Sequence, residues 1–219
     1  MRALSVIIFK FIITISTALF LSACSNTYVE DIKRGASYEY QPGLPELWFE
    51  PAGTITDDGQ PVMKIAGTIP KSSLIYKDVE GRQTASINVN IEVTNTTLDK
   101  TLSDSFKSTI LKDESNSLLN TELFNFYRQY EVDAGSFNVS VSVMDQATGK
   151  LVTRREVAAI PKLREGVRNI TNIRLLAKGI GNSGEYIPIP TYDVNSTADS
   201  LKFEFQVANT LKNDQSLTI

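Results

Sequence analysis

Few side chains in this sequence have the chemistry that catalysis or metal binding requires. Histidine is absent from all 219 residues, which excludes Ser-His-Asp and Cys-His catalysis and every imidazole metal site. A single cysteine, Cys24, excludes an internal disulfide bond and a thiolate cluster. The motifs Ser-x-x-Lys and Gly-x-Ser-x-Gly of serine nucleophiles are also absent. We therefore predict that the protein is not an enzyme.

Neighbouring carboxylates are the remaining candidates for catalysis or metal binding. They occur as Asp57-Asp58, Asp113-Glu114 and Glu131 with Asp133. Such pairs can bind Ca²⁺ or flank a glycosidic bond. None has the alternating acidic pattern of an EF-hand loop, and Asp-Asp-Gly at residues 57–59 is typical of a turn. Turn chemistry is the preferred interpretation, and we predict no metal and no cofactor.

Residues 179–184 read Gly-Ile-Gly-Asn-Ser-Gly, which matches the G-x-G-x-x-G pattern of dinucleotide-binding loops. That pattern needs a helix directly after it, because amides at the helix N-terminus hold the pyrophosphate. Here Ile187-Pro188-Ile189-Pro190 follows, and this segment cannot begin a helix. We interpret the three glycines as loop residues.

Basic residues gather between positions 150 and 178, where eight Lys and Arg residues against two Glu give a local charge of +6. A patch formed by Arg154, Lys162, Arg164 and Arg168 could hold anionic headgroups, lipopolysaccharide phosphates or an acidic partner. Alternation along a strand would send Arg154 and Arg155 to opposite faces, so a solvated surface is the preferred interpretation. The formal net charge of −3 and the pI near 5.2 predict no nucleic-acid binding.

Aromatic residues form two groups that could stack against sugars. One is Trp48-Phe49, and the other comprises Phe124, Phe126, Tyr127 and Tyr130. Core filling is the preferred interpretation, because a sandwich of two sheets needs large side chains between its layers.

Two alternating segments at residues 136–160 predict a β-hairpin. Phe137, Val139, Val141 and Val143 alternate with polar residues, which is the period of a half-buried strand. The turn that follows contains Asp145, which can bond the backbone two residues on, and Gly149, which can adopt a positive φ. A lone hairpin is marginal in water, so further strands must cover its apolar face.

Other segments have the same period and complete the prediction of an antiparallel Ig-like β-sandwich of about eight or nine strands. We expect strands at residues 62–69, 84–94, 136–160 and 172–178, and at 200–208 with Leu201, Phe203, Phe205 and Val207 inward. Residues 98–110 and 115–132 also fit a helix. The serines and threonines between the apolar residues favour a strand in the first segment. A strand is favoured at 122–132 because antiparallel neighbours joined by short turns are common. The two prolines of Ile187-Pro188-Ile189-Pro190 restrict that segment to a sheet edge or a crossing strap.

The N-terminal segment has the features of a secretion signal. Arg2 and Lys10 provide its positive charge, and the apolar core at residues 11–21 is too short to cross a bilayer of about 30 Å. Loss of these two charges with residues 1–23 takes the formal net charge from −3 to −5. We expect a tether at residues 24–45, a β-sandwich domain at 46–210, and a tail or further strand at 211–219. An uncleaved N-terminal anchor is the alternative.

Leu21-Ser22-Ala23-Cys24 resembles the lipobox of bacterial lipoproteins, in which cleavage leaves an obligatory cysteine at the mature N-terminus. The resemblance implies that Cys24 carries a thioether-linked diacylglycerol and an N-acyl group. One acyl chain binds membranes only marginally, so two or three are needed for a lasting anchor. Ser25 follows the cysteine, and by analogy with enterobacterial lipoproteins this favours the outer membrane, facing the periplasm.

The order of the later segments is similar to the N-terminal β-sandwich region of GWxTD-domain bacterial lipoproteins. The likeness rests on Asp133-Ala134-Gly135-Ser136-Phe137, Thr148-Gly149-Lys150, residues 170–176 and Ile187-Pro188-Ile189-Pro190. The Gly-Trp-x-Thr-Asp motif is absent, and the one tryptophan, Trp48, lies near the other end. The resemblance therefore assigns no functional residue beyond Cys24.

We predict a lipid-anchored envelope lipoprotein with a non-catalytic binding or scaffolding role. The alternative is a protein that binds or processes polysaccharides through exposed aromatics or paired carboxylates. A third hypothesis is an accessory subunit of an envelope assembly, in which an edge strand pairs with a partner protein.

Overall fold

The computed structural model describes residues 41, 43–112, 123–163, 168–178, 186–189 and 200–209. Over these residues the chain is almost entirely antiparallel β-strand, with one 3₁₀ turn, η1, at Lys71–Ser73. The predicted all-β sandwich is confirmed. No helix within these ranges is long and apolar enough to span a bilayer. The predicted signal segment and Cys24 lie outside the described residues.

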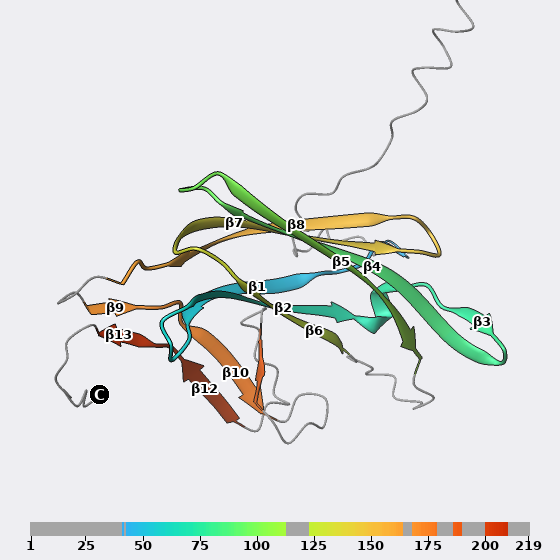
Figure 1. Cartoon of the computed structure of the whole chain (residues 1–219). Helices are drawn as coiled ribbons and strands as arrows, with labels where there is room; N and C mark the ends of the chain where they lie inside the picture. The colour runs from blue at the N-terminus through green and yellow to red at the C-terminus, as the bar shows by residue number, and fades with distance from the viewer. Residues whose placement is uncertain are drawn as a thin grey trace, which may run out of the picture.

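Eight strands form two sheets that face each other (Figure 1). In sheet A, β4 pairs with β3, β5 and β7, and β7 pairs in turn with β8. Sheet B has the order β1-β2-β6. The strands of sheet A are β3 (Lys77–Val79), β4 (Arg82–Asn95), β5 (Lys100–Leu111), β7 (Gly135–Asp145) and β8 (Leu151–Ile160). Those of sheet B are β1 (Trp48–Ile55), β2 (Pro61–Pro70) and β6 (Leu123–Glu131).

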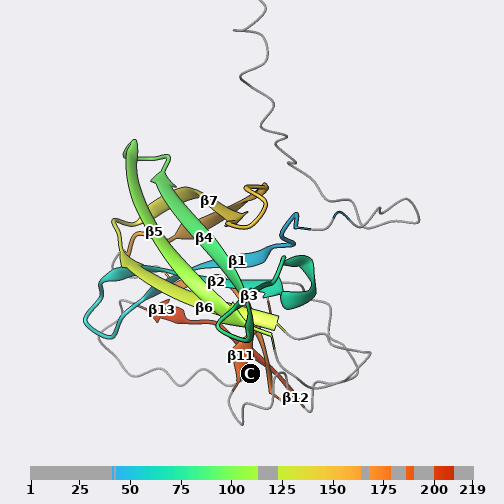
Figure 2. The same cartoon turned by 90° about the vertical axis from the view of Figure 1, so that its right-hand side faces the viewer.

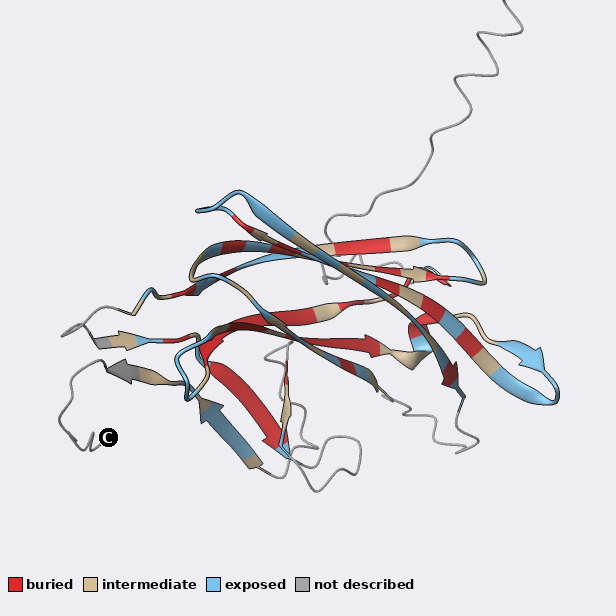
Figure 3. Cartoon of the chain, in the orientation of Figure 1, coloured by how far each residue is buried: buried red, intermediate tan, exposed pale blue. Residues whose placement is uncertain are grey.

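Strand β4 shows how the alternating pattern builds the core. Its residues Ala85, Ile87, Val89, Ile91 and Val93 are at most 2% exposed, whereas the polar residues between them face outward. Figure 3 shows buried and exposed residues alternating along this strand. Burial of each valine or isoleucine side chain among them contributes about 1.5–3 kcal/mol. The core therefore lies between sheets A and B, as the pattern predicts.

The β7–β8 hairpin and its turn are confirmed. Asp145 is 1% exposed and accepts hydrogen bonds from the Ala147 amide at 2.7 Å and the Thr148 amide at 3.1 Å. Gly149 has a φ of +71°, which glycine adopts without steric cost. The Asp145 carboxylate also accepts a hydrogen bond from the Ile75 amide at 2.8 Å, so the turn fixes a segment far away in the sequence.

Two glycines allow elements to approach more closely than a side chain would permit. A Cβ atom on Gly67 of β2 would lie 2.0 Å from the ring of Phe126 on β6. A Cβ atom on Gly53 of β1 would lie 2.4 Å from the Ile160 side chain at the end of β8. These contacts close the sandwich along β1 and β8 and seat an aromatic ring against sheet B.

Strands β5 and β6 confirm the preference for strand over helix at residues 98–110 and 122–132. The argument from antiparallel neighbours joined by short turns does not hold for the second segment. Strand β6 pairs with β2 of sheet B, while β5 pairs with β4 of sheet A, so the chain crosses between layers. Local sequence pattern carries no information about such a crossing, because both strands look half-buried in either sheet.

A third layer lies on the outer face of sheet B (Figure 1). It holds the short strands β9 (Arg168–Ile170), β10 (Arg174–Lys178), β11 (Ile187–Pro188), β12 (Ser200–Glu204) and β13 (Val207–Asn209). Strand β10 lies between β11 and β12, and β9 pairs with β13. The proline-containing strand β11 is therefore at an edge, as predicted.

One prediction for this layer is wrong. Leu201, Phe203 and Phe205 are not inward but 46%, 67% and 37% exposed. The reason is that Arg174 and Glu204 form the face toward sheet B, so the alternate residues of β12 face away. Ile173 precedes β10 and is 58% exposed. Both faces of β10 are buried from Arg174 to Ala177.

Candidate functional site

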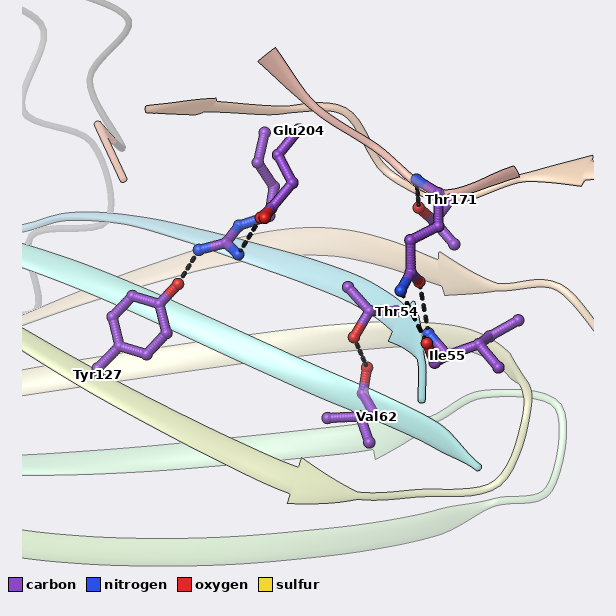
Figure 4. Close-up of polar contacts among 8 residues, drawn as sticks. Thr54, Ile55, Val62, Tyr127, Thr171 and Glu204 are labelled. Carbon is purple, nitrogen blue, oxygen red and sulfur yellow. Dashed lines mark hydrogen bonds and ion pairs between the residues drawn. The ribbon is translucent and has the colours of Figure 1, made fainter. Parts of the chain in front are cut away.

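A buried arginine joins the third layer to sheet B. Arg174 is 4% exposed, and its Nη1 lies 2.9 Å from Glu204 Oε2. Its Nη2 donates a hydrogen bond to the Tyr127 hydroxyl of β6, and the guanidinium lies 5.5 Å from the Tyr127 ring centroid. Figure 4 shows this chain of contacts from Tyr127 to Glu204. The cluster is an interlayer contact between β6, β10 and β12.

The pairing register explains this arrangement. Arg174 lies directly opposite Glu204 in the β10–β12 ladder, and opposed residues project to the same face of a sheet. The Glu204 side chain is 42% exposed, so the carboxylate stays partly hydrated while the guanidinium is buried. Desolvation therefore falls mainly on Arg174, and its attraction to Glu204 and Tyr127 offsets that cost.

A second contact closes the bare edge of β1. The side-chain amide of Gln206 donates to the Ile55 carbonyl at 2.8 Å and accepts from the Ile55 amide at 2.8 Å (Figure 4). Asn172 Oδ1 accepts from the Gly53 amide at 3.2 Å. The Gln206 backbone amide is held in turn by Thr171 Oγ1 at 2.9 Å. Side-chain amides thus take the place of a further strand, and this edge is not open to one.

Exposed apolar side chains gather on the outward face of the third layer. Phe203 lies opposite Leu175 and Leu201 opposite Ala177 in the β10–β12 ladder, and all four project to the face away from Arg174. On this face Leu175 and Ala177 are buried in a cluster with Ile189, whereas Leu201 and Phe203 of β12 are exposed. Ile173 and Phe205 flank the ladder at the next position. The residues Ile173, Leu201, Phe203 and Phe205 are called the C-terminal apolar surface below. Their exposed fractions of 37–67% are unusual for large apolar side chains on neighbouring strands.

An open cleft of about 420 Å³ lies between one end of the sandwich and the third layer. The described residues that line it carry hydroxyl, amide and aliphatic groups, and none of them has an ionisable side chain. These residues can offer hydrogen bonds and apolar contact, but they cannot transfer a proton as an acid or base near neutral pH. The lining residues are Thr97, Gly135, Ser136, Ala159, Ile160, Pro161, Ile170, Thr171 and Asn172.

The predicted basic patch is not assembled by the described residues. Arg154 lies opposite the buried Val141 and is half-buried, whereas Arg155 lies opposite Ser140 on the other face, as alternation predicts. Lys162 is exposed. Arg164 lies outside the described residues, and only the backbone of Arg168 is described. The patch stays a prediction.

Among the described carboxylate pairs, Asp57-Asp58 lies in a turn, whereas Glu131 ends β6 and Asp133 lies in the link to β7. Residues 57–59 form the β1–β2 turn, where Thr56 bonds Asp58 and Gly59 has a φ of +86°. Asp133 pairs with Lys100 at 2.8 Å on the surface, and residues 113–114 lie outside the described ranges. No cluster of three or more Cys, Asp or Glu side chains with metal-binding geometry occurs among the described residues. The glycine pattern at residues 179–184 also lies outside them.

The aromatic run is mostly core, as the preferred interpretation predicted. Phe126 is 6% exposed, and Phe124 and Tyr130 pack against the core cluster. Burial, together with a 2.7 Å hydrogen bond from the Tyr130 hydroxyl to Asp104 Oδ2, raises the pKa of Tyr130 well above its ordinary value. Only Tyr127 of this run is strongly exposed, at 45%, and the Arg174 guanidinium lies near its ring. The run therefore does not form a continuous sugar-stacking platform.

Sequence analysis missed the residues that attach the third layer. Arg174 was counted only as one charge among many, and Gln206 and Asn172 were not singled out. A signal was present for Arg174, because an arginine directly before the apolar residues 175–177 requires a polar partner or a route to water if the strand is buried. Gln206 gave no comparable signal, because its partners are backbone atoms of a strand 151 residues earlier.

The fold and the site define a class of protein: an antiparallel β-sandwich that carries an additional strand layer with an exposed apolar face. Comparison with protein-family models gives no match, and comparison with curated proteins gives no significant match.

Proposed function

We propose that this protein is a lipid-anchored lipoprotein of the bacterial cell envelope that acts by binding or scaffolding and not by catalysis. The observation that carries the binding role is the C-terminal apolar surface. Large apolar side chains that face water mark sites where a protein or a membrane is bound. Four of them, two in the β10–β12 ladder and two beside it, form a candidate contact surface for an envelope protein.

The way this surface is held supports a preformed binding face. The opposite face of the same strands is fixed to sheet B through Arg174, and the neighbouring segment is fixed to β1 through Gln206. Phe203 and Leu201 are therefore presented on a supported strand. A preformed surface loses less conformational entropy on binding than a flexible one.

The membrane role rests on the lipobox-like sequence at Cys24. Two or three acyl chains on that residue would give a lasting anchor, since each buried CH₂ contributes about 0.8 kcal/mol. We place the protein at the outer membrane, facing the periplasm, by analogy with lipoproteins that carry serine after the modified cysteine. The test is membrane fractionation of Cys24→Ala, which we expect to move to the soluble fraction. Retention as firm as that of the wild type would refute lipid anchoring.

The binding role is tested by crosslinking in native membranes with wild type and Phe203→Ser. We expect this substitution to remove a specific crosslinked species without changing the amount of folded protein. Val157→Ser is the matched control, because Val157 is 76% exposed but lies on β8, away from the C-terminal apolar surface. Equal loss in both variants, or no loss in either, would contradict a binding role for this surface.

A further inference from the structure

The second surface that offers binding chemistry is the free edge of β5. This strand spans 12 residues, Lys100–Leu111, and pairs with β4 in an unbroken register. It contains no proline and no bulge. Natural proteins usually blunt such an edge with short strands, proline, bulges or charged residues. The charged residues of β5 are Lys100, Asp104 and Lys107. Figure 2 shows β5 at the margin of sheet A, next to β4.

The direction of the backbone groups of β5 follows from the hydrogen bonds at its end. The Lys112 amide donates a hydrogen bond to the Gln83 carbonyl at 3.0 Å. Counting back from Lys112, every second residue of β5 therefore points its backbone amide and carbonyl toward β4. The residues between them point their amides and carbonyls away from β4. No other described residue hydrogen-bonds to these outward backbone groups, which belong to Thr101, Ser103, Ser105, Lys107, Thr109 and Leu111.

We propose that β5 pairs antiparallel with β5 of a second copy of this chain, in the register that places Phe106 opposite Phe106 of that copy. Two conditions select this type of register. Outward-pointing groups must meet outward-pointing groups for hydrogen bonds to form. A two-fold axis perpendicular to the sheet must also keep the core-facing residues of both copies on one side. Both conditions are met when the two opposed residue numbers have an even sum.

Side-chain chemistry then favours the Phe106 register over the two registers next to it. With Phe106 opposite its symmetry mate, Leu102 lies opposite Ile110, and Asp104 lies opposite Ser108. On the exposed face Ser105 lies opposite Lys107. A shift by two residues in one direction places Phe106 opposite Asp104. A shift in the other direction places Ile110 opposite Asp104, so both neighbouring registers set an apolar residue against a carboxylate.

The pairing uses nearly the whole strand and continues sheet A into the second copy. The environment of Phe106 fits a position at the centre of such a contact. Its ring packs edge-on against Phe126 at 5.6 Å, and the Arg128 guanidinium lies 3.9 Å from its centroid. The ring is therefore supported from within its own sandwich. This surface is separate from the C-terminal apolar surface, so either proposal can fail without the other.

Spin labels on the full chain in membranes test the register. In the proposed pairing Ser103 and Thr109 are each displaced from their symmetry mates by six residues, which gives about 20 Å at 3.4 Å per residue. Thr101 and Leu111 are each displaced by ten residues, which gives about 34 Å. We expect equal distances within each pair of single-cysteine variants. Wild type treated with the same label gives the background from Cys24. Absent coupling, or unequal distances within a pair, would overturn the proposal.

Proline substitutions separate dimer formation from folding. The Ser105 amide points outward, so Ser105→Pro removes no bond to β4 but blocks the second copy. We expect it to abolish the dipolar coupling of the Ser103 label, whereas Ser105→Ala retains the coupling. The Ser108 amide points toward β4, so Ser108→Pro should lower the stability of the fold itself. Coupling that persists in a folded Ser105→Pro variant would overturn the proposal.

Discussion

Replacement of Gly67 with alanine tests how sheet B packs against its own aromatic residue. The new Cβ atom would lie 2.0, 2.3 and 2.7 Å from the Cζ, Cε1 and Cε2 atoms of Phe126, all shorter than any real carbon contact. The Phe126 ring is 6% exposed and packs against Phe106, so it has little room to move. Either the ring or the β2–β6 ladder must shift.

The expected cost combines two opposing effects. Overpacking of a core site costs about 1–3 kcal/mol. Alanine in place of glycine inside a strand recovers about 0.5–1 kcal/mol, because the unfolded chain loses less freedom on folding. We therefore expect Gly67→Ala to lower the free energy of unfolding by about 1 kcal/mol, and by about 2.5 kcal/mol at most, from these two ranges.

A double-mutant cycle with Phe126→Leu isolates the contact. Leucine lacks all three ring atoms that crowd the alanine, so Gly67→Ala should stabilise the Phe126→Leu background by about 0.5 kcal/mol. The sign of the effect thus reverses between the two backgrounds. Urea denaturation of the purified protein and its three variants measures both values. The same cost for Gly67→Ala in both backgrounds would refute the close contact.

Three further predictions concern polar groups that the fold buries. Burial and the neighbouring Asp104 raise the pKa of Tyr130 in the folded state. The protonated tyrosine therefore contributes to stability, in full at pH values below the ordinary tyrosine pKa of about 10. This contribution is lost as the pH rises through the folded-state pKa. Unfolding free energy should therefore fall more steeply above pH 10 in wild type than in Tyr130→Phe, and equal slopes would contradict this. Glu204→Gln should lower the free energy of unfolding by about 1–2 kcal/mol, because the Arg174 guanidinium then stays buried without its negatively charged partner. Arg174→Met should cost less, because methionine removes the buried charge. Thermal unfolding of both variants compares the two costs, and the reverse order would show that Glu204 does not offset the burial of Arg174. Asp145→Ala should lower the free energy of unfolding by about 2–4 kcal/mol, since three backbone amides lose a charged acceptor. Asp145→Asn should cost less, because the amide oxygen can still accept hydrogen bonds. Equal costs in denaturant unfolding would show that hydrogen bonds to the Asp145 carboxylate are not what stabilises the turn.

The strands that the sequence predicts best are those in which one face meets the core and the other meets water. In β4 and β7 each inward residue is aliphatic and each outward residue is polar, so the period of two is visible without any neighbour. The β7–β8 turn was predictable for the same local reason, because Asp145 and Gly149 satisfy the backbone within five residues. Local chemistry determined these elements.

The third layer shows where local pattern fails. Strand β12 alternates as clearly as β4, yet its apolar residues face outward, because the choice of face depends on what lies beneath it. Arg174 and Glu204 meet Tyr127 of β6, which is far away in the sequence. Alternation indicates that the two faces of a strand differ, but it does not indicate which of the two faces a further layer covers.

By itself the sequence determined the all-β class, the long core strands, the central hairpin and a lipobox-like signal at Cys24, because each depends on residues close together along the chain. Only the tertiary structure decided which strands share a sheet, which edge of the sandwich stays open and which apolar side chains remain in water. Those features depend on contacts such as Gln206 with Ile55, which join residues 151 positions apart. No periodicity in the sequence records a contact of that kind.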